Sequence, residues 1–421
     1  MARHIIAALD IGTSTVETVI AEIVRGEETP RILGVGITPS QGVRRGVVID
    51  LGEVMASIRR SVEEARKSSG VSVRSLWLAI GGSHVSVSSS RGVVAVSRAD
   101  GEISPEDVRR VINAAESFIV KNPNKELLHI IPRDFRVDNE SGIKDPVGMH
   151  GVRLEVDALI IECAAPFLKN ILKCVEGAGF AVEDYVFAPL ASARAVLTKR
   201  QKELGVMLLD LGGGTASFVV YEEGVPLHAG VIPLGGSNIT NDVAIGFRTH
   251  VDVAEQVKKA YGSCFPDEFT KRDVIRLSEF LPEDHGVFQG KGAEVTYPRR
   301  ELAEIVSARL QDLFEFLQKE LRRVGRSGLL PAGVMLIGGT SLLPGLVEIT
   351  KRELRLPVER GRPQDFFEGI DEKIAPSLAT ALGLVQWAHG KMYEPEAATF
   401  SSKMLRANQH PIIKWLRSLL P

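Results

Sequence analysis

The sequence has few cysteines, no long apolar run and no marked excess of one charge, and each shortage excludes a class of protein. Its cysteines are widely spaced, without a CxxC pair or a Cys/His cluster, so they predict reduced buried thiols and no zinc site: Cys163, Cys174 and Cys264. No stretch approaches the ~20 apolar residues of a membrane-spanning helix. The apolar N-terminal run, interrupted by Asp10, is too short for a signal peptide, so we expect a cytoplasmic chain. A formal net charge of −2 gives no reason to expect nucleic-acid binding.

An internal repeat is the most informative feature of the 421 residues, a length that allows two to four domains. In each copy, an apolar strand ends in an aspartate, a glycine turn follows, and two further strands come after it. The predicted strands are 4–10, 15–24 and 31–38 in the first copy, and 205–210, 216–221 and 225–232 in the second. Such a duplication predicts an α/β fold of two similar halves.

The regions around the repeat have different patterns of apolar and polar residues. Between the copies, alternating VSVSSS and VVAVS suggest an antiparallel ribbon, with a helix over 100–121 and short strands near Leu128 and Leu154. We therefore predict a small inserted α+β domain. Helical spacing predicts helices over 51–68, 166–176, 189–200, 299–324, 346–354 and 376–389, with a helix-rich region over 239–294.

Two glycine turns follow the aspartates of the repeat. In the first, Gly12 permits a tight turn whose amides and hydroxyls, from Thr13 and Ser14, point at an anion. The second has three successive glycines that bring bare backbone close to a ligand: Asp210, Gly212, Gly213, Gly214 and Thr215. The carboxylates of Asp10 and Asp210 suit a hydrated magnesium ion. An ordinary hairpin explains the first turn alone, but it explains the pair poorly.

A third glycine turn follows the strand 333–337 and consists of Gly338, Gly339 and Thr340. ALDIGTS, MLLDLGGGT and MLIGGTSLLPG, in that order, resemble the phosphate 1, phosphate 2 and adenosine motifs of the actin and heat-shock-chaperone ATPase superfamily. FAPLASARAVL and IAPSLATALGL resemble its two connecting helices. GVSVRSLWLAIGGSHV and the segment 234–262 narrow the resemblance to the FtsA family of bacterial cell division proteins.

This resemblance implies an α/β, actin-like (ribonuclease H-like) duplicated fold with an inserted small α+β subdomain and a C-terminal amphipathic helix. It divides the chain into subdomain 1A (1–83 and 164–203, with part of 380–390), 1C (84–163), 2A (204–238 and 300–390), 2B (239–299), a linker (391–410) and a membrane-targeting helix (411–421).

The resemblance also implies ATP and Mg²⁺ as cofactors, with Gly235 and Gly236 in the same site. Glu255 and Lys258 would contact the ribose or base, and their i, i+3 spacing on one helix permits this. A surface ion pair is the alternative. Thr15 stands where the family often has lysine, so we expect at most slow ATP hydrolysis.

The last residues form a predicted amphipathic helix. Its apolar residues cover one arc of roughly 160°: Ile412, Ile413, Trp415, Leu416, Leu419 and Leu420. Lys414 and Arg417 lie opposite. After a polar linker, this pattern favours a helix that folds on an anionic membrane surface; docking on the protein's own core is the alternative.

The family implies several partners: the C-terminal tail of FtsZ, other divisome proteins, the membrane and further copies of the chain in actin-like filaments. Arg299, Arg300 and Glu304 begin a long helix near the region where the acidic FtsZ tail would bind; a merely solvated helix start is the alternative. We expect a peripheral protein at the division site, on the cytoplasmic face of the inner membrane. A PilM-like pilus-assembly ATPase and a small-molecule kinase of the same superfamily are the alternative functions.

Overall fold

The structure is a computed structural model of the chain. It describes residues 3–393 except 25, 27–28, 118–121, 281–295, 364–366, 368–369 and 372–373. The predicted linker, apart from its first three residues, and the whole terminal helix lie outside this range. None of the helices within it is long and apolar enough to cross a membrane.

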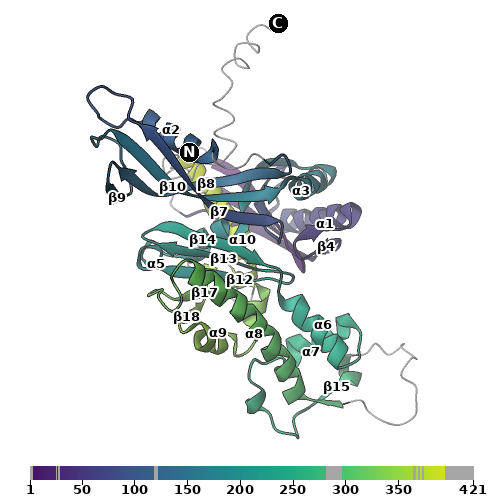
Figure 1. The fold of residues 1–421 in the computed structure, drawn as a ribbon. Helices are drawn as coiled ribbons and strands as arrows, with labels where there is room; N and C mark the ends of the chain where they lie inside the picture. The colour runs from purple at the N-terminus through teal and green to yellow at the C-terminus, as the bar shows by residue number, and fades with distance from the viewer. Residues whose placement is uncertain are drawn as a thin grey trace.

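The first half is built on a five-stranded sheet in the order β11-β6-β1-β2-β3. These strands are β1 (Arg3–Ile11), β2 (Thr15–Val24), β3 (Arg31–Pro39), β6 (Ser75–Ile80) and β11 (Ala181–Phe187). Helices α1 (Leu51–Ser69) and α3 (Ala165–Gly177) lie beside each other (Figure 1), with α1 against β2 and β3. A small hairpin, β4 (Val43–Arg44) and β5 (Val47–Val48), lies between β3 and α1 in the chain.

The second half repeats this plan, with a five-stranded sheet in the order β14-β13-β12-β17-β18. Its strands are β12 (Val206–Leu211), β13 (Ala216–Glu222), β14 (Val225–Ile232), β17 (Val334–Ile337) and β18 (Val358–Arg360). In both sheets the aspartate-ending strand is central, antiparallel to the next strand in the chain and parallel to a later one. The predicted duplication is therefore confirmed at the level of topology.

Both faces of β12 are buried, against different cores. Met207, Leu209 and Leu211 join the core of the second half, whereas Val206 and Leu208 join the larger core that contains the first half. Because side chains alternate along a strand, β12 contributes to both cores at once. Asp210 lies on the same face as Leu208, toward the contact between the halves.

Two helices lie between the halves: α4 (Ala188–Val196) and α10 (Ala375–Tyr393). A Cβ at Gly383 would lie 2.0 Å from the carbonyl oxygen of Ala191, so the two backbones touch. Ser192 and Thr380 share a buried hydrogen bond of 2.9 Å across this crossing. Small residues thus permit the close helix crossing that the sequence predicts.

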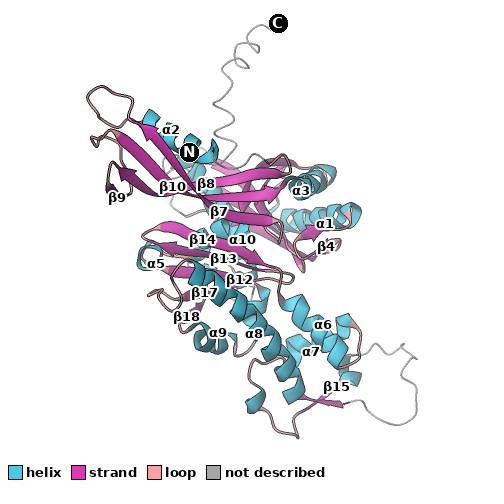
Figure 2. Ribbon diagram, viewed as in Figure 1, coloured by secondary structure: helices cyan, strands magenta, loops and turns pink. Residues whose placement is uncertain are grey.

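The insertion has a four-stranded sheet in the order β7-β10-β8-β9, covered by α2 (Pro105–Ser117), and a core of its own (Figure 2). Its strands are β7 (Val85–Ala95), β8 (Lys125–Val137), β9 (Glu140–Ile143) and β10 (Arg153–Ala164). The strands predicted near Leu128 and Leu154 are confirmed, but they are not short, because β8 has 13 residues and β10 has 12. Their mutual pairing spans nearly both strands, and two shifts in register leave Arg133 and Leu128 of β8 unpaired.

Helices α6 (Gly236–Gly246) and α7 (Val251–Tyr261) lie beyond the second sheet (Figure 1). The long α8 (Arg299–Arg323) extends from them to the sheet, whose core it shares, and α9 (Leu346–Leu354) packs beside it. Strands β15 (Val274–Arg276) and β16 (Thr296–Pro298) pair nearby. The single helix predicted over 189–200 is wrong: a capping box of Thr198 and Gln201 begins a separate α5 (Lys199–Leu204). The helix predicted from residue 100 begins at Pro105, and residues 391–393, predicted as linker, belong to α10.

Candidate functional site

The first predicted phosphate turn closes at the end of β1. The amide of Gly12 donates a hydrogen bond of 2.9 Å to the carbonyl of Thr15, which folds the chain back into β2. A Cβ at Gly12 would lie 2.8 Å from that oxygen, so the turn needs glycine. The hydroxyl of Thr13 accepts a bond of 3.0 Å from the amide of Gly46, in the hairpin of β4 and β5.

The second turn repeats this geometry and meets the first across the two halves. The amide of Gly212 donates to the carbonyl of Thr215 at 3.0 Å. A Cβ at Gly213 would lie 2.0 Å from the hydroxyl of Ser14, and a Cβ at Gly214 would lie 2.5 Å from that of Thr13. The structure therefore brings the two turns, about 200 residues apart in the chain, into direct contact.

The third turn and the start of α6 join the second turn. The carbonyl of Gly212 accepts bonds from the amide of Gly236 at 3.0 Å and the hydroxyl of Thr340 at 3.1 Å. A Cβ at Gly235 would lie 2.6 Å from the carbonyl oxygen of Gly213, and one at Gly338 would lie 2.4 Å from a carboxylate oxygen of Asp210. A Cβ at Gly339 would meet nothing within 4 Å, which leaves open space beside the third turn.

Glu255 and Lys258 on α7 belong to the same network. The ammonium of Lys258 donates to the carboxylate of Glu255 at 2.6 Å, to the hydroxyl of Thr240 at 2.9 Å and to the carbonyl of Gly236 at 3.1 Å. The side chain of Lys258 is 11% exposed, so the pair is not a surface ion pair. Burial lowers the pKa of Lys258; in Glu255 burial opposes ionisation, but Lys258 and Thr240 outweigh it and lower the pKa.

Two half-buried aspartates lie at the floor of the contact between the turns. Burial raises the pKa of Asp10 to about 6. Burial and the charge of Asp10 raise the pKa of Asp210 to about 7, against a hydrogen bond from Thr380. Thr380 also bonds Ser192, so the carboxylate at the phosphate turn is linked to the helix crossing between the halves.

Glu17 is a third carboxylate at this floor, and the sequence analysis missed it. It is the cross-strand partner of Asp10 and is 3% exposed. One carboxylate oxygen accepts from the hydroxyl of Thr15 at 3.0 Å, and the other has no hydrogen-bond partner among the residues that the structure describes. Burial, then the charge of Asp10, raise its pKa well above the usual range. The signal was in the sequence: a tight turn that pairs Ile11 with Val16 must also pair Asp10 with Glu17.

These residues fit a magnesium nucleotide. Desolvation raises the pKa values of these carboxylates, and the oxygen of Glu17 that lacks a partner among the described residues can accept a hydrogen bond from a metal-bound water. In the part of the chain that the structure describes, no group of three or more acidic, histidine or cysteine side chains is arranged to hold a metal directly. Mg²⁺ does not need such a group, because it binds through one or two carboxylates and keeps several waters.

Comparison with known proteins identifies the family. The family model for cell division protein FtsA matches residues 207–383, and the model for the SHS2 domain inserted in FtsA matches residues 82–162. The chain is 34% identical to FtsA of Pseudomonas aeruginosa, over 98% of this chain and 96% of that one. It is 36% identical to FtsA of Borreliella burgdorferi, over 97% of both chains, and 36% identical to that of Bacillus subtilis, over 92% and 84%.

The chain belongs to the FtsA family. It is therefore a cell division protein with the actin-like fold that the motifs predict, and the second model matches the position of the insertion. Among solved structures, the PilM–PilN type IV pilus biogenesis complex superposes with a TM-score of 0.64 at 20% identity, covering 90% of this chain and 97% of that one. MreB5 of Spiroplasma citri bound to ADP gives 0.54 at 11% identity, covering 94% and 99%. These likenesses show the fold alone, so the PilM-like function is not favoured.

The predicted partner residues lie at the start of α8 and differ in their surroundings. Arg299 donates to the carbonyl of Tyr261 at 3.1 Å, and its guanidinium lies over the ring of Phe269. Arg300 is exposed and pairs with Glu304 at 3.0 Å and with Asp267 at 3.3 Å. Of the two arginines, Arg300 is thus the more available to a peptide on this FtsA-family surface.

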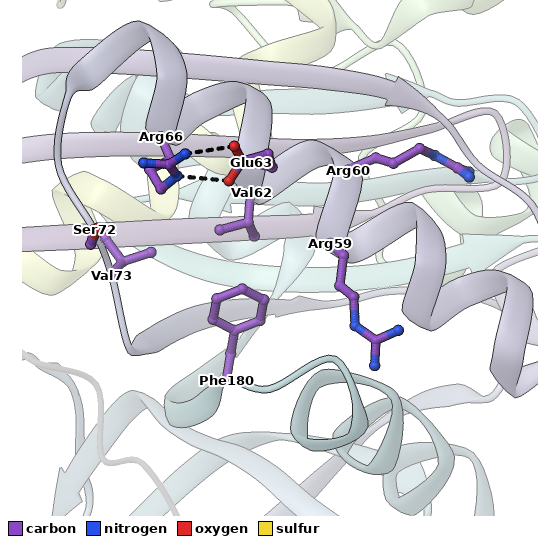
Figure 3. A pocket seen from close by; sticks show the side chains of 8 residues that line it. All are labelled: Arg59, Arg60, Val62, Glu63, Arg66, Ser72, Val73 and Phe180. Atoms are coloured by element: carbon purple, nitrogen blue, oxygen red, sulfur yellow. Dashed lines mark hydrogen bonds and ion pairs between the residues drawn. The ribbon is translucent and has the colours of Figure 1, made fainter.

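A pocket of about 530 Å³ lies away from the turns, between α1 and Phe180 (Figure 3). Its charged side chains already have partners: Arg66 faces Glu63 at 2.7 Å, and Arg59 donates to the carbonyls of Gly177 and Ala178. Because these groups are satisfied within the protein, this pocket is a weaker candidate site for an anionic ligand than the turns are.

Proposed function

We propose that this FtsA-family chain binds ATP and Mg²⁺ between its two halves, polymerises on the cytoplasmic face of the inner membrane and ties FtsZ filaments to it at the division site. The observation that carries the proposal is the meeting of the two phosphate turns, in a chain that belongs to this family. Contacts from both halves to one ligand favour the closed state over an open one, so nucleotide acts as a switch on the actin-like body.

The roles of the residues follow from their positions. The amides of the second turn and the hydroxyls of Thr13 and Ser14 hold phosphates. Asp10 and Asp210 would hold Mg²⁺ through its waters, which supplies positive charge between carboxylates and phosphates. Glu255 and Lys258 position the sugar or base beside the third turn. Thr15 adds no cation near the phosphates, so the site holds ATP with at most slow hydrolysis.

The terminal helix, residues 411–421, provides the membrane contact, and the region of α7 and the start of α8 receives the acidic FtsZ tail. The motifs supporting this arrangement are the apolar arc ending at Leu420, with Lys414 and Arg417 opposite, and the exposed Arg300. Self-association and contacts with other divisome proteins complete the role.

Co-sedimentation with anionic vesicles tests the proposal. The full chain with ATP and Mg²⁺ should bring an FtsZ tail peptide into the vesicle pellet, and a chain lacking residues 411–421 should leave both in solution. A control that replaces only Lys414 and Arg417 with glutamine should weaken pelleting and make it less sensitive to salt. A full chain that pellets without retaining the peptide would contradict the FtsZ role and leave the anchor role standing.

A further inference from the structure

The hairpin of β4 and β5 has a backbone geometry that its sequence does not favour. Its two central residues, Arg45 and Gly46, have φ of 52° and 73°, as in a type I′ turn. Such turns favour Asn, Asp or Gly at the first central position, because other side chains crowd the backbone there. An arginine held in this conformation suggests that its side chain serves something other than the turn.

The tip of this hairpin lies against both phosphate turns. The amide of Gly46 donates to the hydroxyl of Thr13 in the first half. A Cβ at Gly214, in the second half, would lie 2.9 Å from the Cα of Arg45 and 3.0 Å from its amide nitrogen. Arg45 therefore sits where the two halves meet, beside the glycines that would hold phosphate.

The positive charge of Arg45 also has no partner among the residues that the structure describes: its side chain is exposed and makes no hydrogen bond or ion pair with them. Lys258, the cation of the third turn, is already committed to Glu255, Thr240 and the carbonyl of Gly236. Among the described residues, the site thus has one buried and two half-buried carboxylates at its floor and a guanidinium without a partner at its edge.

We infer that Arg45 is a phosphate-binding residue of the nucleotide site, and that it contacts the phosphates beyond the first. A planar guanidinium binds phosphate oxygens in pairs, and arginine is long enough to reach an anion held on the neighbouring turn. The inference rests on the proposed binding of ATP and assigns a residue to it. It also explains how a chain with Thr15 in place of lysine supplies a positive side chain to the phosphates.

Titration of the full chain with ATP, ADP and AMP in the presence of Mg²⁺ tests the inference. The variant Arg45→Gly removes the charge and adopts the positive φ freely, so its fold should be at least as stable as that of the parent. We expect it to bind ATP and ADP about tenfold to a hundredfold more weakly and AMP within about twofold of the parent. The variant Arg44→Ala, which removes the neighbouring exposed arginine, is the matched control and should bind all three like the parent.

Unchanged ATP affinity in Arg45→Gly, or an equal loss for AMP, would overturn the inference while leaving the proposed function intact. An equal loss in Arg44→Ala would also overturn it, because the effect would then come from general surface charge. A parent chain that binds none of the three nucleotides would overturn the proposed function first, and the inference with it.

Discussion

The two phosphate turns have the same backbone but different side chains. Each closes with a bond from glycine to threonine, Gly12 to Thr15 and Gly212 to Thr215. The first turn offers hydroxyls, whereas the second offers bare glycine. Opposite the aspartate, the first half has Glu17 and the second has Ser217. The two copies thus share the backbone of the turn but differ in what they offer a ligand. The first half offers polar and charged side chains, and the glycines of the second half let the backbone approach the ligand closely.

The largest expected effect comes from filling the contact between the turns. In Gly214→Ala the new methyl group would press on the backbone of Arg45 and the hydroxyl of Thr13, so the halves cannot close. We expect ATP affinity, measured by titration calorimetry, to fall about tenfold to a hundredfold. The same change at Gly52, where a Cβ meets its nearest atom at 3.4 Å, is the control and should leave affinity unchanged.

The second turn differs from the first in its link, through Gly236, to the ion pair of Lys258 and Glu255, and Lys258→Met breaks that link. The loss leaves Glu255, which is partly buried, without its closest ionic partner. We expect the free energy of unfolding to fall by about 2 kcal/mol, discounted because Glu255 is partly exposed. Lys259→Met, which removes a well-exposed lysine also near Glu255, should change it by less than about 0.5 kcal/mol in the same denaturant titration. Equal losses in both variants would show that the burial of Lys258 does not matter.

Replacing the glycine that closes each turn, Gly12 or Gly212, with alanine compares how tightly the two turns are packed. A Cβ at Gly12 would lie 2.8 Å from the carbonyl oxygen of Thr15, whereas one at Gly212 would lie 3.2 Å from that of Thr215. Gly12→Ala should therefore cost about 1 kcal/mol more stability than Gly212→Ala. Thermal unfolding without nucleotide gives the comparison, and a larger cost at Gly212 would show that the turns differ in a way that the distances do not capture.

The carboxylates predict a pH dependence in the chain without nucleotide or divalent ions. A carboxyl group whose pKa is raised by folding stabilises the folded state at low pH, and this contribution is lost as pH rises through the folded value. With Asp10 near 6 and Asp210 near 7, stability should fall by about 1 kcal/mol between pH 6 and pH 8.

Two variants test whether this change of stability with pH comes from the carboxylates of the first half. Glu17→Gln removes one of the buried carboxylates and should flatten the slope. Ser217→Ala changes the corresponding position of the second half and should not. Denaturant titrations at the two pH values provide the measurement, and stability that rises with pH would contradict this assignment of burial as the dominant cause.

Much of this architecture is predictable because it repeats. Strand–aspartate–glycine patterns occur twice, and local turn chemistry determines each turn, so the paired sheets and the meeting of Asp10 with Asp210 follow from the sequence. The actin-like fold with an inserted domain is confirmed. The two small-residue helices, α4 and α10, were also foreseen, since close crossing needs Ala191 and Gly383 or residues of similar size.

The missed features depend on register and on distant contacts. In the sequence, Glu17 is a polar residue in a largely apolar strand. Only the cross-strand pairing places it beside Asp10. Arg45 lies in an ordinary-looking RRG segment, and only the folded hairpin brings it to Gly214. The long strands of the insertion were underestimated because Pro132 and scattered charges interrupt their pattern, whereas pairing with a long partner holds them extended.

A double-mutant cycle on Asp10 and Asp210 tests the central claim most directly, namely that the two turns form one site for ATP and Mg²⁺. ATP affinity with Mg²⁺ would be measured for Asp10→Asn, Asp210→Asn and the pair. If both carboxylates serve one ion, each single change weakens binding, and the double change weakens it less than the two together, with a coupling of about 1 kcal/mol. Strictly additive losses, or a loss in one variant alone, would contradict a shared site.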